Sequence, residues 1–361
     1  MRILGIESSC DETAVAIVED GRNLLSNVVK SQIDIHAVYG GVVPEVAARS
    51  HIEVINPAID QALKDAQLSW DDIDAIAVTY APGLLGSLLI GTLAARTLAI
   101  LKNKPLYPIH HVEAHVYANF ITKSNPALNL NLPSKQPAFP MLALIVSGGH
   151  SQLVLFRDHG DFELLGQTQD DAVGEAFDKV AKILGLPYPG GPSIAEAAKT
   201  GDPLAYALPK AKLQGAYDFS FSGLKTAVLR AVQREVGVDV SFPSFELAER
   251  LDDAQRANFA ASFQHVAVET LVDKTLQAFR DHSPASVVIA GGVAANQELR
   301  RQLAERLPIA IDYAPMSLCT DNGAMIASLA YFYAQKLEKS DPLSLEVTPS
   351  LSMSKTAWAK N

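Results

Sequence analysis

The sequence predicts an α/β protein built from two similar halves, and three observations lead to this class. The chain has 361 residues, more than one compact unit usually contains. Hydrophobic residues make up 48% and charged residues 19%, which excludes a disordered chain. Finally, one order of elements occurs twice: an apolar strand, a small polar turn, a second strand and a glycine hairpin. Ser8 and Ser147 are separated by the same 139 positions as Gly21 and Gly160 (147 − 8 and 160 − 21).

The first copy of this pattern begins at the N-terminus. Residues 3–6 form a short apolar run that predicts a strand, and residues 8–12 form a polar turn. Residues 13–18 are apolar and β-branched and predict a second strand. Asp20 and Gly21 then predict a hairpin turn before a third strand over residues 24–29.

The second copy has the same order of elements and lies in the middle of the chain. Strands are predicted over residues 142–146, 153–156 and 162–165, with the turn Ser147-Gly148-Gly149-His150 after the first of them. Glycines in such a turn let backbone N–H groups approach an anion, although Ser-Gly-Gly alone is also compatible with a simple turn. A whole-domain duplication of this kind is typical of the actin-like ATPase (ASKHA) fold, in which two domains flank a nucleotide cleft. We therefore expect that fold.

The remaining segments complete two predicted domains. Between the copies we expect a helix from Pro44 to residue 67 that Pro57 interrupts, and then a buried strand over residues 73–79. Further helices are predicted over residues 84–101, 112–121, 173–184, 221–236, 252–279 and 296–307 and from about residue 321, with a strand over residues 286–290 and a loop at Gly190-Gly191-Pro192. These elements divide the chain into an N-terminal domain (1–121), a linker rich in Asn, Pro and Ser (122–140), a C-terminal domain with helical insertions (141–339) and a poorly ordered tail (340–361).

Charge and composition limit the possible partners and compartment. The net charge of −10 excludes a general RNA coat protein, so any RNA contact needs a local basic patch. Cys10 and Cys319 are the two cysteines, too few for a disulfide framework. The N-terminus does not resemble a signal peptide, and the apolar stretch 84–101 contains Arg96, which favours a buried helix over a membrane span. We expect a soluble, cytoplasmic protein that does not bind membranes.

Two histidines suggest a metal site. His111 and His115 are four residues apart, so both imidazoles project from one face of a helix. Val112 stands where the HExxH protease motif requires glutamate. Ala114 stands where the inverted motif HxxEH, read from His110, requires histidine. The pair therefore needs a third ligand from elsewhere. Asp321 is the best candidate, although an aspartate there is also a typical helix N-cap.

Other nucleotide-binding signatures are weak or missing. The chain contains neither a P-loop with Lys-Ser/Thr nor a Gly-x-Gly-x-x-Gly motif. Asp178 and Lys179 lie on a predicted helix, where a charged pair is compatible with a solvated face as well as with a binding role. From the residues alone, an actin-like ATPase or small-molecule kinase therefore stays open as an alternative, while the metalloprotease motif is absent.

Six motifs, in order, resemble one family. They are residues 6–13 (IESSCDET), 111–115 (HVEAH), 146–150 (VSGGH), 174–179 (GEAFDK), 219–225 (FSFSGLK) and 321–325 (DNGAM). The chain resembles the TsaD family, the bacterial catalytic subunits that make N6-threonylcarbamoyladenosine in tRNA, formerly labelled O-sialoglycoprotein endopeptidases. The match runs from about residue 1 to about residue 330.

The resemblance implies an activity and a set of site residues. The expected reaction moves a threonylcarbamoyl group from threonylcarbamoyl-AMP to N6 of the adenosine just 3′ of the anticodon, in tRNAs that read ANN codons, and releases AMP. One divalent ion, Fe²⁺ or Zn²⁺, is expected on His111, His115 and Asp321, where it acts as a Lewis acid. The adenylate is expected to bind Ile145, Val146, Ser147, Gly148, Gly149, Asp178, Gly191 and Asn296. Ala195 stands where many members carry aspartate, so one expected ribose contact has no carboxylate here.

The resemblance and the charge pattern also suggest a base and partners. We expect Asp11 or Glu12 to accept the proton of the adenosine amine. A related non-catalytic paralogue, contacting the N-terminal domain, and a small P-loop ATPase are the implied protein partners. Residues 179–234 contain eight Lys or Arg against three Asp or Glu, so we expect this stretch, with Lys210 and Lys212, to contact tRNA.

Overall fold

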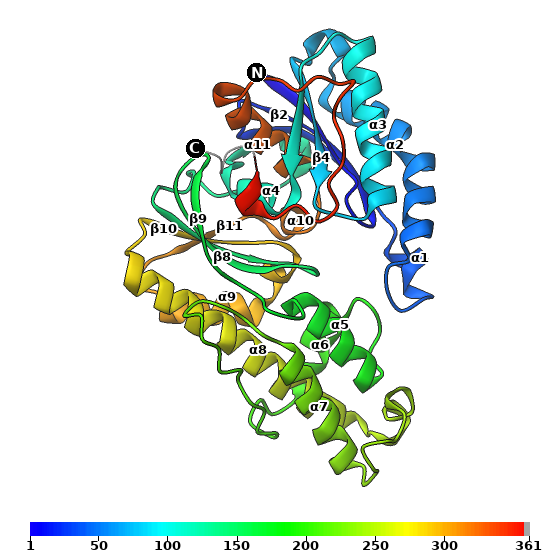
Figure 1. The fold of residues 1–361 in the computed structure, drawn as a ribbon, viewed down its shortest axis with the longest axis vertical. Helices are drawn as coiled ribbons and strands as arrows, with labels where there is room; N and C mark the ends of the chain where they lie inside the picture. Colours follow the sequence, from blue (N-terminus) through cyan, green and yellow to red (C-terminus); the bar gives the residue numbers. More distant parts are fainter. Residues whose placement is uncertain (357–361) are drawn as a thin grey trace. The chain divides into compact units, whose positions relative to one another are not determined.

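The structure, a computed structural model, describes residues 1–356 and contains two mixed β-sheets (Figure 1). The first sheet has the strand order β5-β4-β1-β2-β3-β6. Its strands are β1 (Arg2–Glu7), β2 (Glu12–Glu19), β3 (Asn23–Ser31), β4 (Ala75–Ala81), β5 (Leu106–His110) and β6 (Lys123–Ser124). β1, β2 and β3 are antiparallel, whereas β4 and β5 continue parallel to β1.

The second sheet repeats this plan. Its order is β11-β10-β7-β8-β9, the same as the first sheet without β6. The strands are β7 (Met141–Val146), β8 (Ser151–Asp158), β9 (Asp161–Gln167), β10 (Ser286–Ala290) and β11 (Ile311–Tyr313). β2 begins at Glu12 and β8 at Ser151, again 139 positions apart (151 − 12). The duplication that the sequence predicts is confirmed, and with it the actin-like α/β fold class.

Helices cover both faces of the first sheet within one compact unit, which contains Met1–Pro140 and the residues from Asp312 onward. α2 (Pro44–Ala66) and α3 (Leu85–Leu101) pack against β2 and β4, and α11 (Gly323–Lys336) packs against β1 and β2. A Cβ on Gly5 would lie 2.4 Å from the Gly323 carbonyl oxygen, so only glycine permits this approach of strand and helix. The contact brings the start of α11 to the sheet, directly beside α4 (His111–Tyr117).

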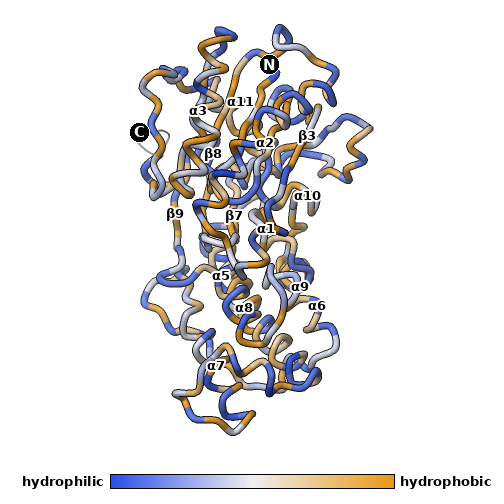
Figure 2. Tube along the Cα trace, turned by 90° about the vertical axis from the view of Figure 1, so that its right-hand side faces the viewer, coloured by the Kyte–Doolittle hydropathy of each residue, from blue (hydrophilic) through white to orange (hydrophobic). Residues whose placement is uncertain are grey.

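The helices of the second half form one packed group. α5 (Val173–Leu184), α6 (Gly190–Ala197), α7 (Ser222–Glu235), α8 (Asp253–His282) and α9 (Gln297–Arg306) make its framework. Hydrophobic and hydrophilic residues alternate along α8, as expected for a helix with one buried face (Figure 2). Asp252 caps its N-terminus by accepting a hydrogen bond from the Gln255 backbone N–H at 2.7 Å.

Several local predictions were wrong. Pro57 does not interrupt α2, because the burial of Ile55, Ala58 and Ile59 against the sheet outweighs one missing backbone hydrogen bond. Gly190-Gly191-Pro192 is not a loop but the start of α6, where proline is tolerated because the first N–H groups have no helical partner. The short helices α1 (Ile33–Ala37) and α10 (Met316–Cys319) were not predicted at all.

Two further segments are more ordered than the sequence indicates. The segment 122–140, predicted as a linker, contributes β6, which pairs with β3. In the tail, Ser340 N–H donates to the Leu106 carbonyl and Thr348 N–H donates to the Tyr80 carbonyl, so residues 340–356 are anchored to the first sheet. Residues 357–361 of the predicted tail lie outside the described chain.

The chain divides into two compact units. Unit 1 contains Met1–Pro140, Phe156–Glu163 and the residues from Asp312 onward, and unit 2 contains Met141–Leu155 and Leu164–Ile311. Helix α11 and the tail therefore fold with the N-terminal half. The domain boundaries given above stay a prediction. Within residues 1–356, every helix is too short or too polar to cross a membrane.

Candidate active site

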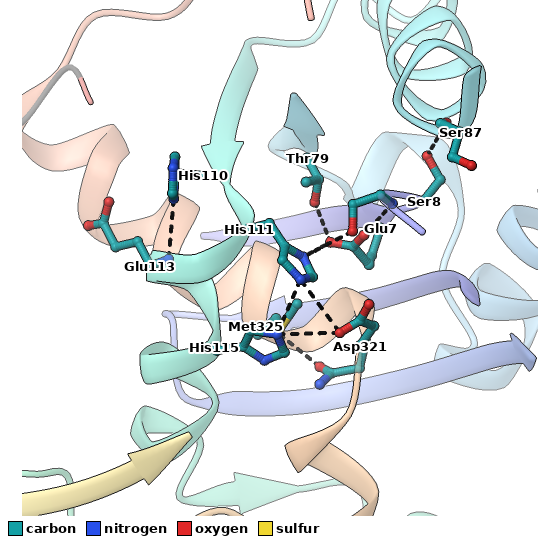
Figure 3. Close-up of polar contacts among 12 residues, drawn as sticks. Glu7, Ser8, Thr79, Ser87, His110, His111, Glu113, His115, Asp321 and Met325 are labelled. Carbon is teal, nitrogen blue, oxygen red and sulfur yellow. Dashed lines mark hydrogen bonds and ion pairs between the residues drawn. The ribbon is translucent and has the colours of Figure 1, made fainter. Parts of the chain in front are cut away.

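Three candidate metal ligands meet in unit 1 (Figure 3). His111 and His115 project from one face of α4, and Asp321 lies two residues before α11. His111 Nε2 and His115 Nε2 are 3.2 Å apart. Asp321 Oδ1 lies 3.6 Å from the first nitrogen and 3.3 Å from the second. The structure thus brings together two residues of one short helix and a third more than 200 positions away.

This triangle fits a metal ion. Ligand atoms about 2.0–2.1 Å from a tetrahedral ion lie roughly 3.3 Å from one another, close to the three observed separations. Both histidines are buried and Asp321 is half-buried. Two imidazoles and one carboxylate are a donor set that binds divalent transition metals and leaves coordination positions open. The His-His-Asp group can therefore hold one metal ion.

Glu7, at the end of β1, orients His111. His111 Nδ1 lies 3.1 Å from Glu7 Oε2, so an N–H at Nδ1 donates to the carboxylate and leaves Nε2 for a metal. The same carboxylate accepts hydrogen bonds from the Ser9 backbone N–H and the Thr79 hydroxyl, both at 2.5 Å. The role of Glu7 was not predicted. A carboxylate directly after the apolar run of residues 3–6 was the available signal.

The charges of this cluster shift one another. Burial alone would raise the pKa of Glu7, but the charge and hydrogen bond of His111 outweigh it and lower the pKa. Burial alone would lower the pKa of His111, but Asp321 and Glu7 raise it to about 9. Without a metal, the His111 imidazolium therefore balances two carboxylates at neutral pH.

Of the two predicted catalytic acids, Asp11 lies in the turn between β1 and β2, and Glu12 is the first residue of β2. Helix α3 holds this turn, since Ser8 Oγ donates to the Ser87 carbonyl at 2.9 Å and Ser87 Oγ donates to the Cys10 carbonyl at 3.0 Å. Asp11 is buried and Glu12 is half-buried. Burial, together with the negative charges of Asp321 and Asp11, raises the pKa of Glu12 to about 10. The structure therefore brings Glu12 within electrostatic reach of the candidate metal ligand Asp321, and Asp11 lies beside Glu12.

The predicted phosphate loop lies in unit 2, directly after β7. The Ser147 backbone N–H donates to the His150 carbonyl at 2.8 Å and closes the turn. A Cβ on Gly148 or Gly149 would meet no atom within 4 Å, so this face of the loop is open. A Cβ on Gly174 would lie 2.5 Å from the Ser147 carbonyl oxygen, which places the start of α5 against the loop. Backbone N–H groups beside a helix N-terminus are favourable for an anion.

The other candidate adenylate-binding residues differ in the chemical groups that they can present to a ligand. Ile145 and Val146 have fully buried side chains, so only their backbone groups can contact a ligand. Asp178 Oδ1 accepts from the Gly190 N–H at 2.7 Å and thereby joins α5 to α6, while a Cβ on Gly191 would meet open space. Asn296 caps α9 through the Leu299 N–H. Its amide also donates to Gln264 of α8 at 2.9 Å.

The strand-to-helix turn after β10 also reaches this loop. Gly291 has φ = +90°, a conformation that side-chain-bearing residues rarely adopt. A Cβ there would lie 2.4 Å from the Val146 carbonyl oxygen. The loop after β7, the start of α5 and the turn after β10 therefore meet within unit 2.

Comparison with known sequences identifies a family. A family model described as "TsaD: tRNA N6-adenosine threonylcarbamoyltransferase" matches residues 23–328. A protein of that name from Thermomicrobium roseum is 51% identical over 358 residues, covering 96% of this chain and 95% of that protein. A relative of the same name from Geobacillus kaustophilus is 46% identical, covering 97% of this chain and 96% of its own length.

Comparison with solved structures supports the fold. HypF from T. kodakarensis superposes with a TM-score of 0.61 and 14% identity, over 95% of this chain and 50% of that chain. A full-length HypF in a phosphate- and nucleotide-bound form gives a TM-score of 0.55 and 15% identity, over 94% of this chain and 47% of that one. At these identities the likeness concerns the fold alone.

Proposed function

This chain belongs to the TsaD family of tRNA N6-adenosine threonylcarbamoyltransferases, and on that premise we propose its substrates and the roles of its residues. As a family member it transfers a threonylcarbamoyl group to N6 of an adenosine in tRNA. The proposed donor is threonylcarbamoyl-AMP, and the proposed acceptor is the adenosine just 3′ of the anticodon in tRNAs that read ANN codons. The amine nitrogen attacks the carbamoyl carbon, the bond from that carbon to the phosphate oxygen breaks, and AMP and a proton leave.

The His-His-Asp triangle is the observation that most supports this proposal. His111, His115 and Asp321 would hold one divalent ion, Fe²⁺ or Zn²⁺, since two imidazoles and a carboxylate suit both metals. When bound, such an ion supplies a Lewis acid for the carbamoyl and phosphate oxygens. Glu7 fixes the ring of His111 and keeps its Nε2 available.

We assign the adenylate to the open loop after β7 in unit 2. Backbone N–H groups of Ser147, Gly148 and Gly149 would contact its phosphate, with Ile145 and Val146 contributing backbone groups. Asp178, Gly191 and Asn296 would contact the nucleoside. The carboxylate of Asp178, which accepts the Gly190 N–H, is the proposed contact to the ribose.

We assign proton acceptance to the acidic turn after β1. The amine of adenosine is a poor base, so its proton must leave as the new bond forms. Glu12 is protonated at neutral pH while its surroundings are negative, since its pKa is raised to about 10. Positive charge beside Asp321 would lower this pKa, and Asp11 is the second candidate acceptor.

One face of α3 is exposed and apolar, and it is the proposed contact surface for the paralogue. Leu85, Leu89 and Leu93 follow one another at four-residue spacing on α3 and are 55%, 40% and 51% exposed. The opposite face of α3 buries Leu88 and Ala95. The expectation that this helix lies in the core therefore holds for one face only. A row of exposed leucines is typical of a protein interface. The small P-loop ATPase is proposed on the family resemblance.

One reaction tests the proposal. Purified protein is incubated with threonylcarbamoyl-AMP and an ANN-reading tRNA transcript, with and without the paralogue, and nucleosides are analysed by mass spectrometry. Formation of the modified adenosine and AMP in equal amounts is expected, with His111→Ala inactive. ATP turnover that needs no tRNA, without nucleoside modification, would instead indicate a kinase or ATPase.

A further inference from the structure

Much of the positive charge between residues 179 and 234 is neutralised inside unit 2. Lys210 Nζ lies 2.8 Å from Glu269 and 2.7 Å from Asp273, both on α8. Other lysines of the stretch have carboxylate partners too, namely Lys179, Lys199 and Lys225. Two carboxylates beside the Lys210 ammonium group offset its positive charge, so a phosphate gains little net attraction at this place. Lys210 is therefore a poor RNA ligand, and the charge available to RNA lies elsewhere.

Part of the positive charge that has no carboxylate partner within residues 1–356 borders a hollow beside the C-terminal half of α7. The hollow has a volume of about 290 Å³, near the lower end of ordinary ligand pockets. Arg230 and Arg234 line it together with apolar side chains, which include Leu208, Pro209 and Val240. It therefore combines cationic groups with an apolar wall.

Both guanidinium groups are available to a ligand. The guanidinium of Arg234 makes no hydrogen bond or ion pair within residues 1–356. Arg230 Nη1 donates to Gln233 Oε1 at 2.8 Å and to the Val240 carbonyl at 3.1 Å, which fixes the plane of the group. Its Nε and Nη2 groups make no hydrogen bond in the same part of the chain. The carboxylate of Asp239 interacts electrostatically with Arg230 and offsets part of its charge.

The wall of the hollow is fixed before any ligand binds. Gln233, only 2% exposed, donates from Nε2 to the Val240 carbonyl at 3.2 Å and to the Phe242 carbonyl at 3.4 Å. The Val238 N–H donates to the Gln233 carbonyl at 3.0 Å. A buried amide thus ties the loop after α7 to the helix, so a ligand would not have to order it.

We propose that this hollow seats one unpaired nucleotide of the tRNA substrate. Its phosphate contacts Arg230 and Arg234, and its base packs on the apolar wall and the guanidinium plane. This proposal rests on the proposed function and adds a tRNA contact to it. Proteins recognise unpaired RNA in this way, with a stacked base and a neutralised phosphate. A chain with a net charge of −10 needs such local sites to hold a polyanion.

Binding of a tRNA transcript at several salt concentrations tests the phosphate contact. Arg230→Ala with Arg234→Ala should weaken binding about tenfold at 0.1 M salt and reduce the salt slope by about 0.7, the value for one phosphate on a single strand. Lys210→Ala is the matched control, because its charge is paired already, and it should leave the slope unchanged. Identical slopes for the double variant and the wild type would overturn the proposal.

A second variant tests the seat for the base. Ala227→Phe fills the hollow from α7 while both arginines remain, so affinity should fall several-fold with an unchanged salt slope. Adenylate affinity serves as the folding control for every variant. Loss of association with the paralogue, with tRNA binding intact, would mean that a protein docks here and would overturn the proposal. If the wild-type protein binds tRNA but never modifies it, the proposed function is wrong and the proposed tRNA contact is unaffected.

Discussion

At the level of single residues, Glu7 shows how much of the metal group depends on an outer partner. It is fully buried, and it contacts the candidate ligand His111 without belonging to the His-His-Asp group. Glu7→Gln replaces a charged acceptor by a neutral amide of the same shape. Metal affinity should fall about 10- to 100-fold, as is usual for such partners. Competition with a chelator at pH 7.5 measures this, and Glu19→Gln on the surface should change nothing. Equal affinities for wild type and Glu7→Gln would leave Glu7 a purely structural role.

Glu113 carries a pH-dependent cost to stability. Burial raises its pKa to about 8, against 4.5 when unfolded, although the Tyr333 hydroxyl donates to it at 3.0 Å. Between these two values the folded state keeps a proton that the unfolded state has lost. The free energy of unfolding therefore falls as pH rises through this window, by up to about 1.4 kcal/mol per pH unit.

Glu113→Gln should remove that contribution. Urea unfolding of chelator-treated protein at pH 5, 6.5 and 8 should show a flatter pH dependence for the variant, which becomes the more stable form at pH 8. The exposed Glu53→Gln should keep the slope of the wild type. If Glu113→Gln keeps that slope as well, the carboxyl of Glu113 is not neutral in the folded protein.

At the level of elements, the loop after β7 separates ligand contact from packing. Gly148→Val places its side chain in open space, so the fold should persist while adenylate affinity falls at least tenfold. Gly174→Val drives a Cβ to within 2.5 Å of the Ser147 carbonyl oxygen, so it should lower the melting temperature instead. Calorimetric titration with a non-reactive adenylate analogue, beside thermal melts, distinguishes the two. Unchanged affinity in Gly148→Val would remove this loop from the adenylate site.

The elements also show what sequence reasoning could and could not reach. Strand periodicity and glycine hairpins are local signals, and they located both copies of the duplicated unit. His111 and His115 were found because helical spacing is local as well. Glu7 and the neutralised Lys210 were missed, because their roles depend on partners 104 and 63 residues away. Pro57 was misjudged because tertiary burial outweighed a local rule.

At the level of the whole molecule, the exposed leucines of α3 predict dependence on a partner. Leu89→Glu with Leu93→Glu should abolish association with the paralogue and the activity that depends on it. Stability of the isolated chain should change by no more than about 0.5 kcal/mol per site, since both side chains are partly solvated already. Size-exclusion chromatography of the mixture measures association. Leu204→Glu, at a site 76% exposed in unit 2, is the control. Full activity of the wild-type chain alone would refute the dependence.

The contact between Gly5 and Gly323 has a consequence for biosynthesis. β1 leaves the ribosome long before the helix that covers it, α11, which is made only after all of unit 2. One face of the first sheet therefore stays uncovered while about half of the chain is translated. Asp321 arrives with the same late segment, so the metal group cannot form on a truncated product. Any metal loading at these three residues therefore follows the translation of Asp321, and a chain terminated before α11 has an uncovered sheet that chaperones and proteases can recognise.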